Sequence, residues 1–142
     1  MRIAIGSDHG GFELKQSIKN YLSGTEHAFV DLGCNSNDSV DYPEYAEKVV
    51  QYVLHNGYDI GILLCGTGQG MAICANKHQR IRAALCTDTN LSEQARSHGN
   101  CNILCMGGRT TDNDTALAIL ETFLNTEFQG ERHEKRIKMF SR

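Results

Sequence analysis

Short, mainly apolar segments of the chain alternate with longer segments in which apolar residues recur every three or four positions. The short segments predict buried strands, because strands covered on both faces lack the alternation of half-exposed ones. The longer segments predict helices with one apolar face, as with Leu14, Ile18 and Leu22. The strands are expected at residues 2–6, 27–31, 59–64, 82–86 and 102–106.

The helices are expected between and after these strands. One follows Gly10 and Gly11, and two short ones begin near Met71 and Thr89. The last, a basic helix, covers roughly residues 131–140. The two longest apolar stripes are Ala46, Val49, Val50, Val53 and Leu54, and Ala116, Ile119, Leu120, Phe123 and Leu124. Strands alternating with helices indicate a parallel sheet covered on both faces, and such sheets bind ligands at the carboxyl ends of their strands.

Length and composition predict one domain over residues 1–142. The chain contains a single Pro and no Trp, and no linker, repeat or low-complexity run divides it. A formal charge of −3 and a pI near 6.0 argue against nucleic-acid binding and against an anionic membrane surface. The absence of a long apolar stretch or a signal-like start predicts a cytoplasmic protein.

The six cysteines form no C-x-x-C pair, so the sequence predicts reduced thiols and no metal site. Cys65, Cys86 and Cys105 lie in or beside apolar runs, where reduced cysteines usually behave as small hydrophobic residues. Cys65 differs, because it opens the glycine-rich stretch Cys65-Gly-Thr-Gly-Gln-Gly-Met71. Its thiolate has two possible uses, as a nucleophile with an adjacent base or as a general base; the alternative is a core cysteine at the end of a strand.

The glycines of residues 66–70 allow backbone amides to converge on an anion between a buried strand and a helix. A glycine-rich turn without a ligand is the simplest alternative. A dinucleotide site, with Asp88 as the ribose-binding acid, is another. The loop, however, reads G-x-G-x-G rather than G-x-G-x-x-G, and the following helix is too short.

Other candidate side chains lie at the carboxyl ends of strands or on the last helix. Asp8 and His9 follow the first strand, where a histidine can meet a phosphate or orient a sugar hydroxyl. Arg132 and Arg136 are four residues apart, so they share a helix face that a phosphate would suit; Arg109 adds a third guanidinium. The alternative is a solvated face stabilised by the pairs Glu131–Lys135 and Glu134–Lys138.

Four blocks resemble the ribose 5-phosphate isomerase B family, which also contains galactose 6-phosphate and allose 6-phosphate isomerases. They are Ile5-Gly-Ser-Asp-His-Gly-Gly11, Asp41-Tyr-Pro43, Cys65 to Met71 with Ala75-Asn-Lys77, and Gly130-Glu-Arg-His-Glu-Lys-Arg136. The resemblance implies a Rossmann-like α/β/α domain with five parallel strands in the order 2-1-3-5-4. It also implies a homodimer, or a tetramer made of two dimers, that works without metal or cofactor in the non-oxidative pentose phosphate pathway.

The same resemblance assigns roles to residues. It implies that Cys65 moves the proton between carbons 1 and 2 of the sugar with the help of Thr67, while amides of Gly66, Gly68 and Gly70 stabilise the enediolate. His98 is the expected acid for opening the furanose ring, assisted by Asp8 and Tyr42. The expected contacts to phosphate and substrate are His9, Arg109, Arg132 and Arg136.

His98 precedes the last strand, so it belongs at the sheet edge opposite Cys65, and we expect a two-fold dimer to bring them together. Where the family usually reads His-Asn, this chain reads His98-Gly99-Asn100. Asn100 is the candidate replacement, and otherwise Gly99→Asn should raise catalytic efficiency. Galactose 6-phosphate isomerases typically lack the intact cysteine block in one subunit type, which favours ribose 5-phosphate as the substrate. A six-carbon sugar phosphate and a non-catalytic phosphosugar-binding module remain the alternatives.

Overall fold

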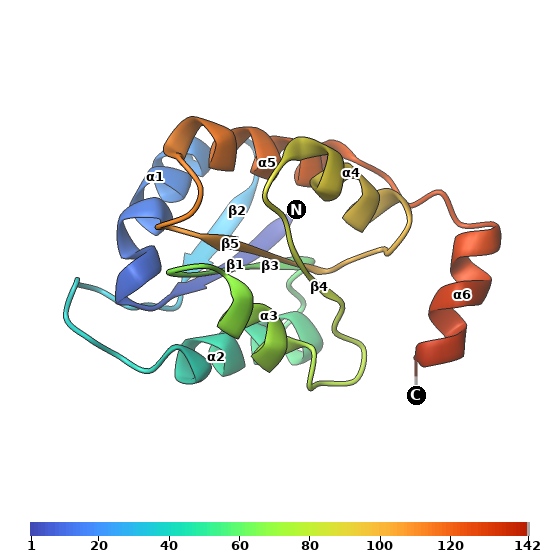
Figure 1. Ribbon diagram of the computed structural model, residues 1–142, viewed down its shortest axis with the longest axis horizontal. Coiled ribbons are helices and arrows are strands. Elements are labelled where there is room, and N and C mark those ends of the chain that lie inside the picture. The colour runs from blue at the N-terminus through green and yellow to red at the C-terminus, as the bar shows by residue number, and fades with distance from the viewer. Residues whose placement is uncertain (142) are drawn as a thin grey trace.

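One parallel sheet runs through the centre of the computed structural model, which describes residues 1–141 (Figure 1). Its strand order is β2-β1-β3-β5-β4, which confirms the predicted order. Ile3 of β1 lies beside Ile60 of β3, and Gly61 of β3 lies beside Ile103 of β5. The strands are β1 (Arg2–Ser7), β2 (Ala28–Asp31), β3 (Ile60–Cys65), β4 (Ala83–Leu85) and β5 (Ile103–Gly107).

Helices cover both faces of this sheet. Figure 1 shows α1, α4 and α5 on one face and α2 and α3 on the other, while α6 stands apart at the C-terminal end. None of the helices within residues 1–141 is both long and apolar enough to cross a membrane. The helices are η1 (His9–Gly11, a 3-10 turn), α1 (Phe12–Ser23), α2 (Tyr42–His55), α3 (Gln69–Ala75), α4 (Thr89–Ser97), α5 (Asn113–Asn125) and α6 (Arg132–Phe140).

The apolar core lies in two layers, one on each side of the sheet. Ile3 and Ile5 of β1 pack with α1 and α5, whereas Ala4 between them packs with α2. This division follows from strand geometry, because successive side chains point to opposite faces. Burying one such Ile or Leu contributes roughly 1.5–3 kcal/mol. Consecutive apolar residues in these strands are therefore needed to supply both layers.

Helix α2 approaches the sheet closely because two glycines of the central strands lie beneath Val49. A Cβ atom placed on Gly61 would lie 2.5 Å from Val49 Cγ1, and one on Gly6 would lie 2.8 Å from Val49 Cγ2. Real Cβ atoms are not found at such distances, so α2 takes this position only over residues without side chains. The start of α2, at Tyr42, is placed over the carboxyl edge of the sheet by the same contact.

A lysine is fully buried beneath α1. The side chain of Lys15 is 0% exposed, and its Nζ donates to Asp31 Oδ1 and to the carbonyl of Cys34, each at 2.6 Å. Lys19 Nζ donates to the other oxygen of Asp31 at 2.8 Å. Burial raises the pKa of the Asp31 carboxyl, but the hydrogen bonds from both lysines and from the Gly33 amide outweigh it, so the pKa is lowered overall. These bonds fix the beginning of the loop over residues 33–41.

Candidate active site

Three loops meet at the carboxyl edge of the sheet, after β1, β3 and β5. The Asp8 amide donates to the Leu64 carbonyl at 3.1 Å, and the Gly108 amide donates to the Cys65 carbonyl at 2.8 Å. The Arg109 amide donates to the Gly66 carbonyl at 3.0 Å. The predicted residues on these loops are therefore brought together by backbone hydrogen bonds, and the edge is the one where open α/β sheets bind ligands.

Cys65 is the last residue of β3, and its side chain faces the layer formed by α2 and α3. It is only 5% exposed, and its Sγ accepts a hydrogen bond from the Gly68 amide at 3.1 Å. Gly68 has a φ of 82°, a left-handed conformation that favours glycine and turns this amide back toward the sulfur. A backbone N–H aimed at sulfur stabilises negative charge there, as a general base requires.

Polar and aromatic side chains border the loop over residues 66–70. The guanidinium of Arg109 lies over Gly66, whose Cβ position is 3.0 Å from Arg109 Nη1. The ring of Tyr42 lies against Gly70, with its hydroxyl 3.0 Å from the corresponding Cβ position. Thr67 is exposed, and its Oγ1 accepts from the Gln69 amide at 3.3 Å. Arg109 and Tyr42 thus lie against the two ends of the predicted loop.

Asp8 and His9 occupy the adjoining turn after β1. Asp8 Oδ1 accepts from the amides of Gly10 and Gly11 at 2.9 and 3.2 Å, so half of this carboxylate is used to cap η1. His9 Nδ1 accepts from the Val40 amide at 3.2 Å. Because that nitrogen accepts, a neutral His9 carries its proton on Nε2 and presents an N–H donor to a ligand.

His98 belongs to a second group of residues, at the other end of the molecule. It caps the C-terminus of α4, before β5, so it lies at the amino edge of the sheet as its sequence position predicts. Its ring stacks on that of His133 from α6, with centroids 4.1 Å apart and planes 10° apart. His133 is 7% exposed, and its buried Nε2 has no hydrogen-bond partner within residues 1–141. Burial lowers the pKa of His133, and the neighbouring His98 lowers it further.

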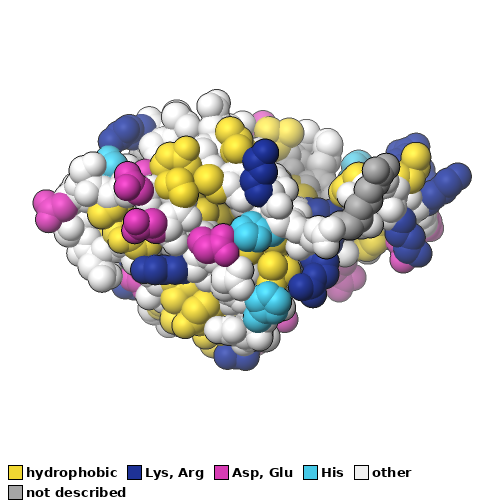
Figure 2. Space-filling model, turned by 90° about the horizontal axis from the view of Figure 1, so that it is seen from below, with side chains coloured by type: hydrophobic (Ala, Val, Ile, Leu, Met, Phe, Trp, Pro, Cys, Tyr) yellow, Lys and Arg dark blue, Asp and Glu magenta, His cyan; other side chains and the backbone are white. Residues whose placement is uncertain are grey.

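Arg132 and Arg136 flank His133 on α6. Glu134 pairs with Lys138 at 3.5 Å, but neither arginine forms a salt bridge in the described part of the chain. Glu131 precedes the helix with a φ of 54°, so the other pair considered, Glu131–Lys135, is not an i,i+4 pair within α6. Figure 2 shows positive side chains gathered over this end of the molecule.

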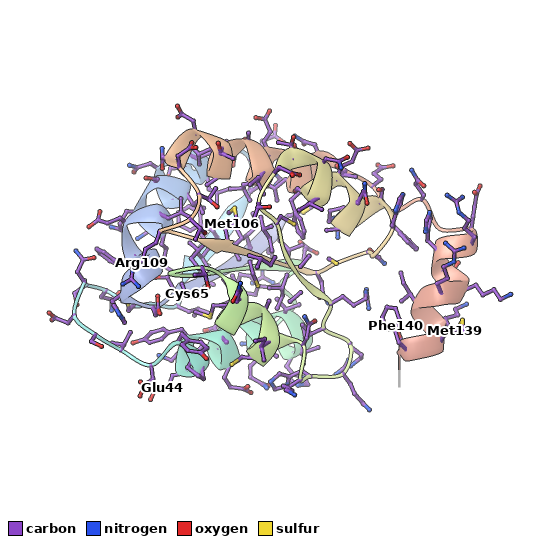
Figure 3. The ribbon with its side chains drawn as sticks, in the orientation of Figure 1. Glu44, Cys65, Met106, Arg109, Met139 and Phe140 are labelled. Atoms are coloured by element: carbon purple, nitrogen blue, oxygen red, sulfur yellow. The ribbon has the colours of Figure 1, made fainter. Side chains whose placement is uncertain are left out.

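The two groups of predicted residues are well separated within one chain. Figure 3 shows Cys65 and Arg109 on one side and Met139 and Phe140 of α6 on the opposite side. Asp8, His9, Tyr42 and residues 66–70 belong with Cys65, whereas Asn100, Arg132 and Arg136 belong with His98. Within one chain the predicted site residues therefore form two separate groups.

Asn100 and Gly99 follow His98 in a tightly packed turn. Asn100 has a φ of 44°, and its carbonyl accepts from the guanidinium of Arg82. A Cβ atom on Gly99 would lie 2.9 Å from the Ala95 carbonyl oxygen and 3.0 Å from Cys101 Sγ. The expectation that Gly99→Asn improves the enzyme thus meets an obstacle the sequence does not reveal, because the new side chain must displace both the Ala95 carbonyl of α4 and the Cys101 sulfur.

The other sequence features have structural explanations. Asp88, the acid considered for a dinucleotide, caps α4 by accepting from the Leu91 amide at 2.8 Å. Among residues 1–141, no three His, Cys, Asp or Glu side chains are grouped closely enough to hold a metal ion. Sequence reasoning missed Lys15 and Arg82. The position of Lys15 on the apolar stripe of its helix, with Ile18 and Leu22, is the one signal that could have revealed its burial.

A doubly covered parallel sheet with a glycine-rich loop at its carboxyl edge defines an α/β protein that binds a small ligand where its strands end. The model of the ribose/galactose isomerase family matches residues 3–140. The chain therefore belongs to that family.

Proteins with the same fold and similar sequences are described as ribose 5-phosphate isomerase B. The one from Listeria innocua is 42% identical, over 98% of this chain and 94% of its own. The one from Escherichia coli is 37% identical, over 96% of this chain and 92% of its own. A crystal structure of the protein from Thermotoga maritima is 53% identical with a TM-score of 0.96, and covers 99% of this chain and 97% of its own.

Proposed function

We propose that this protein interconverts ribose 5-phosphate and ribulose 5-phosphate, with Cys65 as the base that moves the proton. The observation that carries the proposal is the sulfur of Cys65 at the end of β3, 5% exposed and 3.1 Å from the amide of Gly68. Family membership and the relatives described as ribose 5-phosphate isomerases support the substrate. The reaction belongs to the non-oxidative branch of the pentose phosphate pathway and needs no cofactor.

The surroundings of Cys65 support its proposed role in proton transfer. The thiolate takes the proton from C2 of the open-chain aldose, and the electron pair left behind forms an enediolate with negative charge on O1. A proton then passes from O2 to O1, and Cys65 returns its own proton to C1 to give the ketose. We assign to amides of the loop over residues 66–70, those of Gly66, Gly68 and Gly70, the stabilisation of the developing charge, and one such donor is worth about 2.7–4 kcal/mol. Thr67 is exposed and lies two residues after Cys65, and we assign it a part in assisting the proton transfer.

Ring opening must come first, because ribose 5-phosphate exists mainly as a furanose. We assign this step to His98 of a second copy, which donates a proton to the ring oxygen O4 while the C1–O4 bond breaks. Asp8 Oδ2, which has no hydrogen-bond partner within residues 1–141, accepts the proton of the O1 hydroxyl. The hydroxyl of Tyr42 positions the sugar beside it.

The proposal requires a homodimer, or a tetramer of two dimers, in which α6 of one chain reaches the carboxyl edge of the other. Two exposed apolar residues at the end of α6 support this, since Met139 is 70% and Phe140 61% exposed. Arg132 and Arg136 then meet the substrate phosphate together with His9 and Arg109, and Asn100 approaches the sugar hydroxyls. We place the protein in the cytoplasm, acting on a small sugar phosphate rather than on nucleic acid or membrane.

A metal-free assay of both directions of the ribose 5-phosphate reaction tests the proposal. Cys65→Ala should abolish turnover, whereas Cys74→Ala, which removes a partly buried thiol from α3, should leave it unchanged. Allose 6-phosphate serves as a second substrate and would reveal a six-carbon specificity. If the wild type turned over neither sugar, the protein would be a binding module and the proposal would be wrong.

A further inference from the structure

The segment after His98 is a turn whose amides and carbonyls face different partners. The amides of Gly99, Asn100 and Cys101 donate back to carbonyls of α4, at 3.3, 3.2 and 3.0 Å. The carbonyls of the same three residues point away from α4 and need donors from elsewhere. The turn starts at His98, so its conformation helps to hold His98, together with the bond from the His98 amide to the Gln94 carbonyl at 2.9 Å and the stacking on His133.

Two guanidinium groups supply these donors. Arg82 Nε donates to the Gly99 carbonyl at 2.9 Å and to the Asn100 carbonyl at 3.1 Å, and Arg82 Nη2 donates to the Asn100 carbonyl at 2.8 Å. Arg96 Nη1 donates to the Cys101 carbonyl at 2.6 Å. Every carbonyl of residues 99–101 is therefore held by an arginine, and Arg82 holds the two nearest to His98.

The backbone of Arg82 is itself fixed. Its amide donates to Asn102 Oδ1 at 2.9 Å, and Asn102 Nδ2 donates to the Arg80 carbonyl at 2.8 Å. The Asn102 amide returns a hydrogen bond to the Arg82 carbonyl at 3.0 Å. The Arg82 backbone, just before β4, is therefore held in place by hydrogen bonds. The position of its guanidinium in turn determines where the Gly99 and Asn100 carbonyls lie.

Neither arginine is neutralised by a carboxylate in the part of the chain the structure describes. Burial lowers the pKa of Arg96; the neighbouring Cys101 acts in the opposite direction, and the nearby positive charge of Arg82 lowers the pKa further, so placing these two cations close together is unfavourable. Two partly buried, mutually repelling cations are an unfavourable way to build a stable turn. Their planar, rigid donors are a good way to fix its geometry.

We propose that Arg82 is a positioning residue that sets the place of His98 for ring opening. The inference rests on the proposed role of His98 in that step. Lysine at position 82 keeps the charge but presents one ammonium group, which cannot bond to both carbonyls in the fork geometry of arginine. Because a misplacement of 1 Å can cost about a hundredfold in rate, we expect Arg82→Lys to slow ring opening roughly 10- to 100-fold.

Ring opening can be measured separately from isomerisation in the Cys65→Ala background, where proton transfer at carbon is blocked. Exchange between the α and β furanose anomers of ribose 5-phosphate, followed by NMR, then reports the His98 step. The Cys65→Ala protein should exchange the anomers faster than the sugar does without protein. The double variant Cys65→Ala/His98→Asn should return the exchange to the uncatalysed rate. Adding Arg82→Lys or Arg82→Gln should remove most of the acceleration, while KM in the Cys65 parent changes less than kcat.

Arg80→Lys is the matched control, because the Arg80 side chain is exposed and makes no hydrogen bond within residues 1–141. The inference would be overturned if a folded Arg82 variant exchanged the anomers as fast as the Cys65→Ala protein. It would also be overturned if the variants lost stability and slowed every kinetic step to the same extent, since Arg82 would then have only a structural role. Failure of the proposed function would look different, since the wild type itself would then not isomerise ribose 5-phosphate.

Discussion

The buried pair of Lys15 and Asp31 should respond asymmetrically to removal of either partner. In Asp31→Asn the ammonium of Lys15, 0% exposed, loses its counter-charge and cannot reach water. Breaking a buried pair in this way costs roughly 3–5 kcal/mol of unfolding free energy. In Lys15→Met the apolar chain still fills the space, and Asp31, 19% exposed, keeps Lys19 and the Gly33 amide. The main loss is the donor to the Cys34 carbonyl, worth about 1–3 kcal/mol.

Urea unfolding at pH 7 of both variants and of the double variant measures this asymmetry. We expect the double variant to be more stable than Asp31→Asn alone, because Lys15→Met removes the buried ammonium group that has lost its counter-charge. Ser17→Ala provides a control on the same helix, at a hydroxyl that only bonds back to the Glu13 carbonyl. If Lys15→Met proved more destabilising than Asp31→Asn, the charge of Lys15 would not be the costly group, and the reasoning would be refuted.

Further predictions concern acid stability, the turn at Gly99 and the shared site. The lowered pKa of Asp31 contributes stability above about pH 4 that is lost as the pH falls through the folded-state pKa, so the acid-induced drop in melting temperature should be smaller in Asp31→Asn. Gly99→Asn should cost about 1–3 kcal/mol in thermal unfolding, and combining it with Cys101→Ala should cost less than the sum of the two single changes, because the contact with Cys101 Sγ is removed while that with the Ala95 carbonyl remains; strict additivity would contradict the clash. Refolding a mixture of Cys65→Ala and His98→Asn chains should restore about a quarter of wild-type activity, since half the dimers are mixed and each has one intact site; no recovery would mean the site is not shared.

The periodicity of the chain was sufficient to predict every strand and helix of the sheet layers, with ends shifted by one or two residues. The strand expected at 82–86, for example, is β4 at Ala83–Leu85. It starts later because the Arg82 amide is taken by the Asn102 side chain instead of a neighbouring strand. A periodic pattern identifies which residues are buried, but it carries no information about such side-chain competition.

The candidate site was predictable where its residues are contiguous and hidden where they are not. The Cys65 loop could be recognised from seven consecutive residues, and its position at a strand end follows from the fold class. The stacking of His98 on His133 joins residues 35 positions apart, and a charged side chain such as Lys15 is ordinarily assigned to the surface. Such long-range pairings are set by packing, which the order of residues does not specify.

The close packing of α2 against Gly6 and Gly61 has a consequence for substrate choice. Tyr42 and Val49 lie seven residues, or two helical turns, apart on one rigid element, so they move together. A single added methyl group at either glycine, in the core and away from the ligand, would push Val49 outward and carry Tyr42 away from Gly70. In the proposed site, the room left for the sugar beside Tyr42 is therefore governed by two glycines in the middle of the sheet, Gly6 and Gly61. A larger or smaller sugar phosphate could be accommodated by changing the core alone, with every residue that touches the ligand kept.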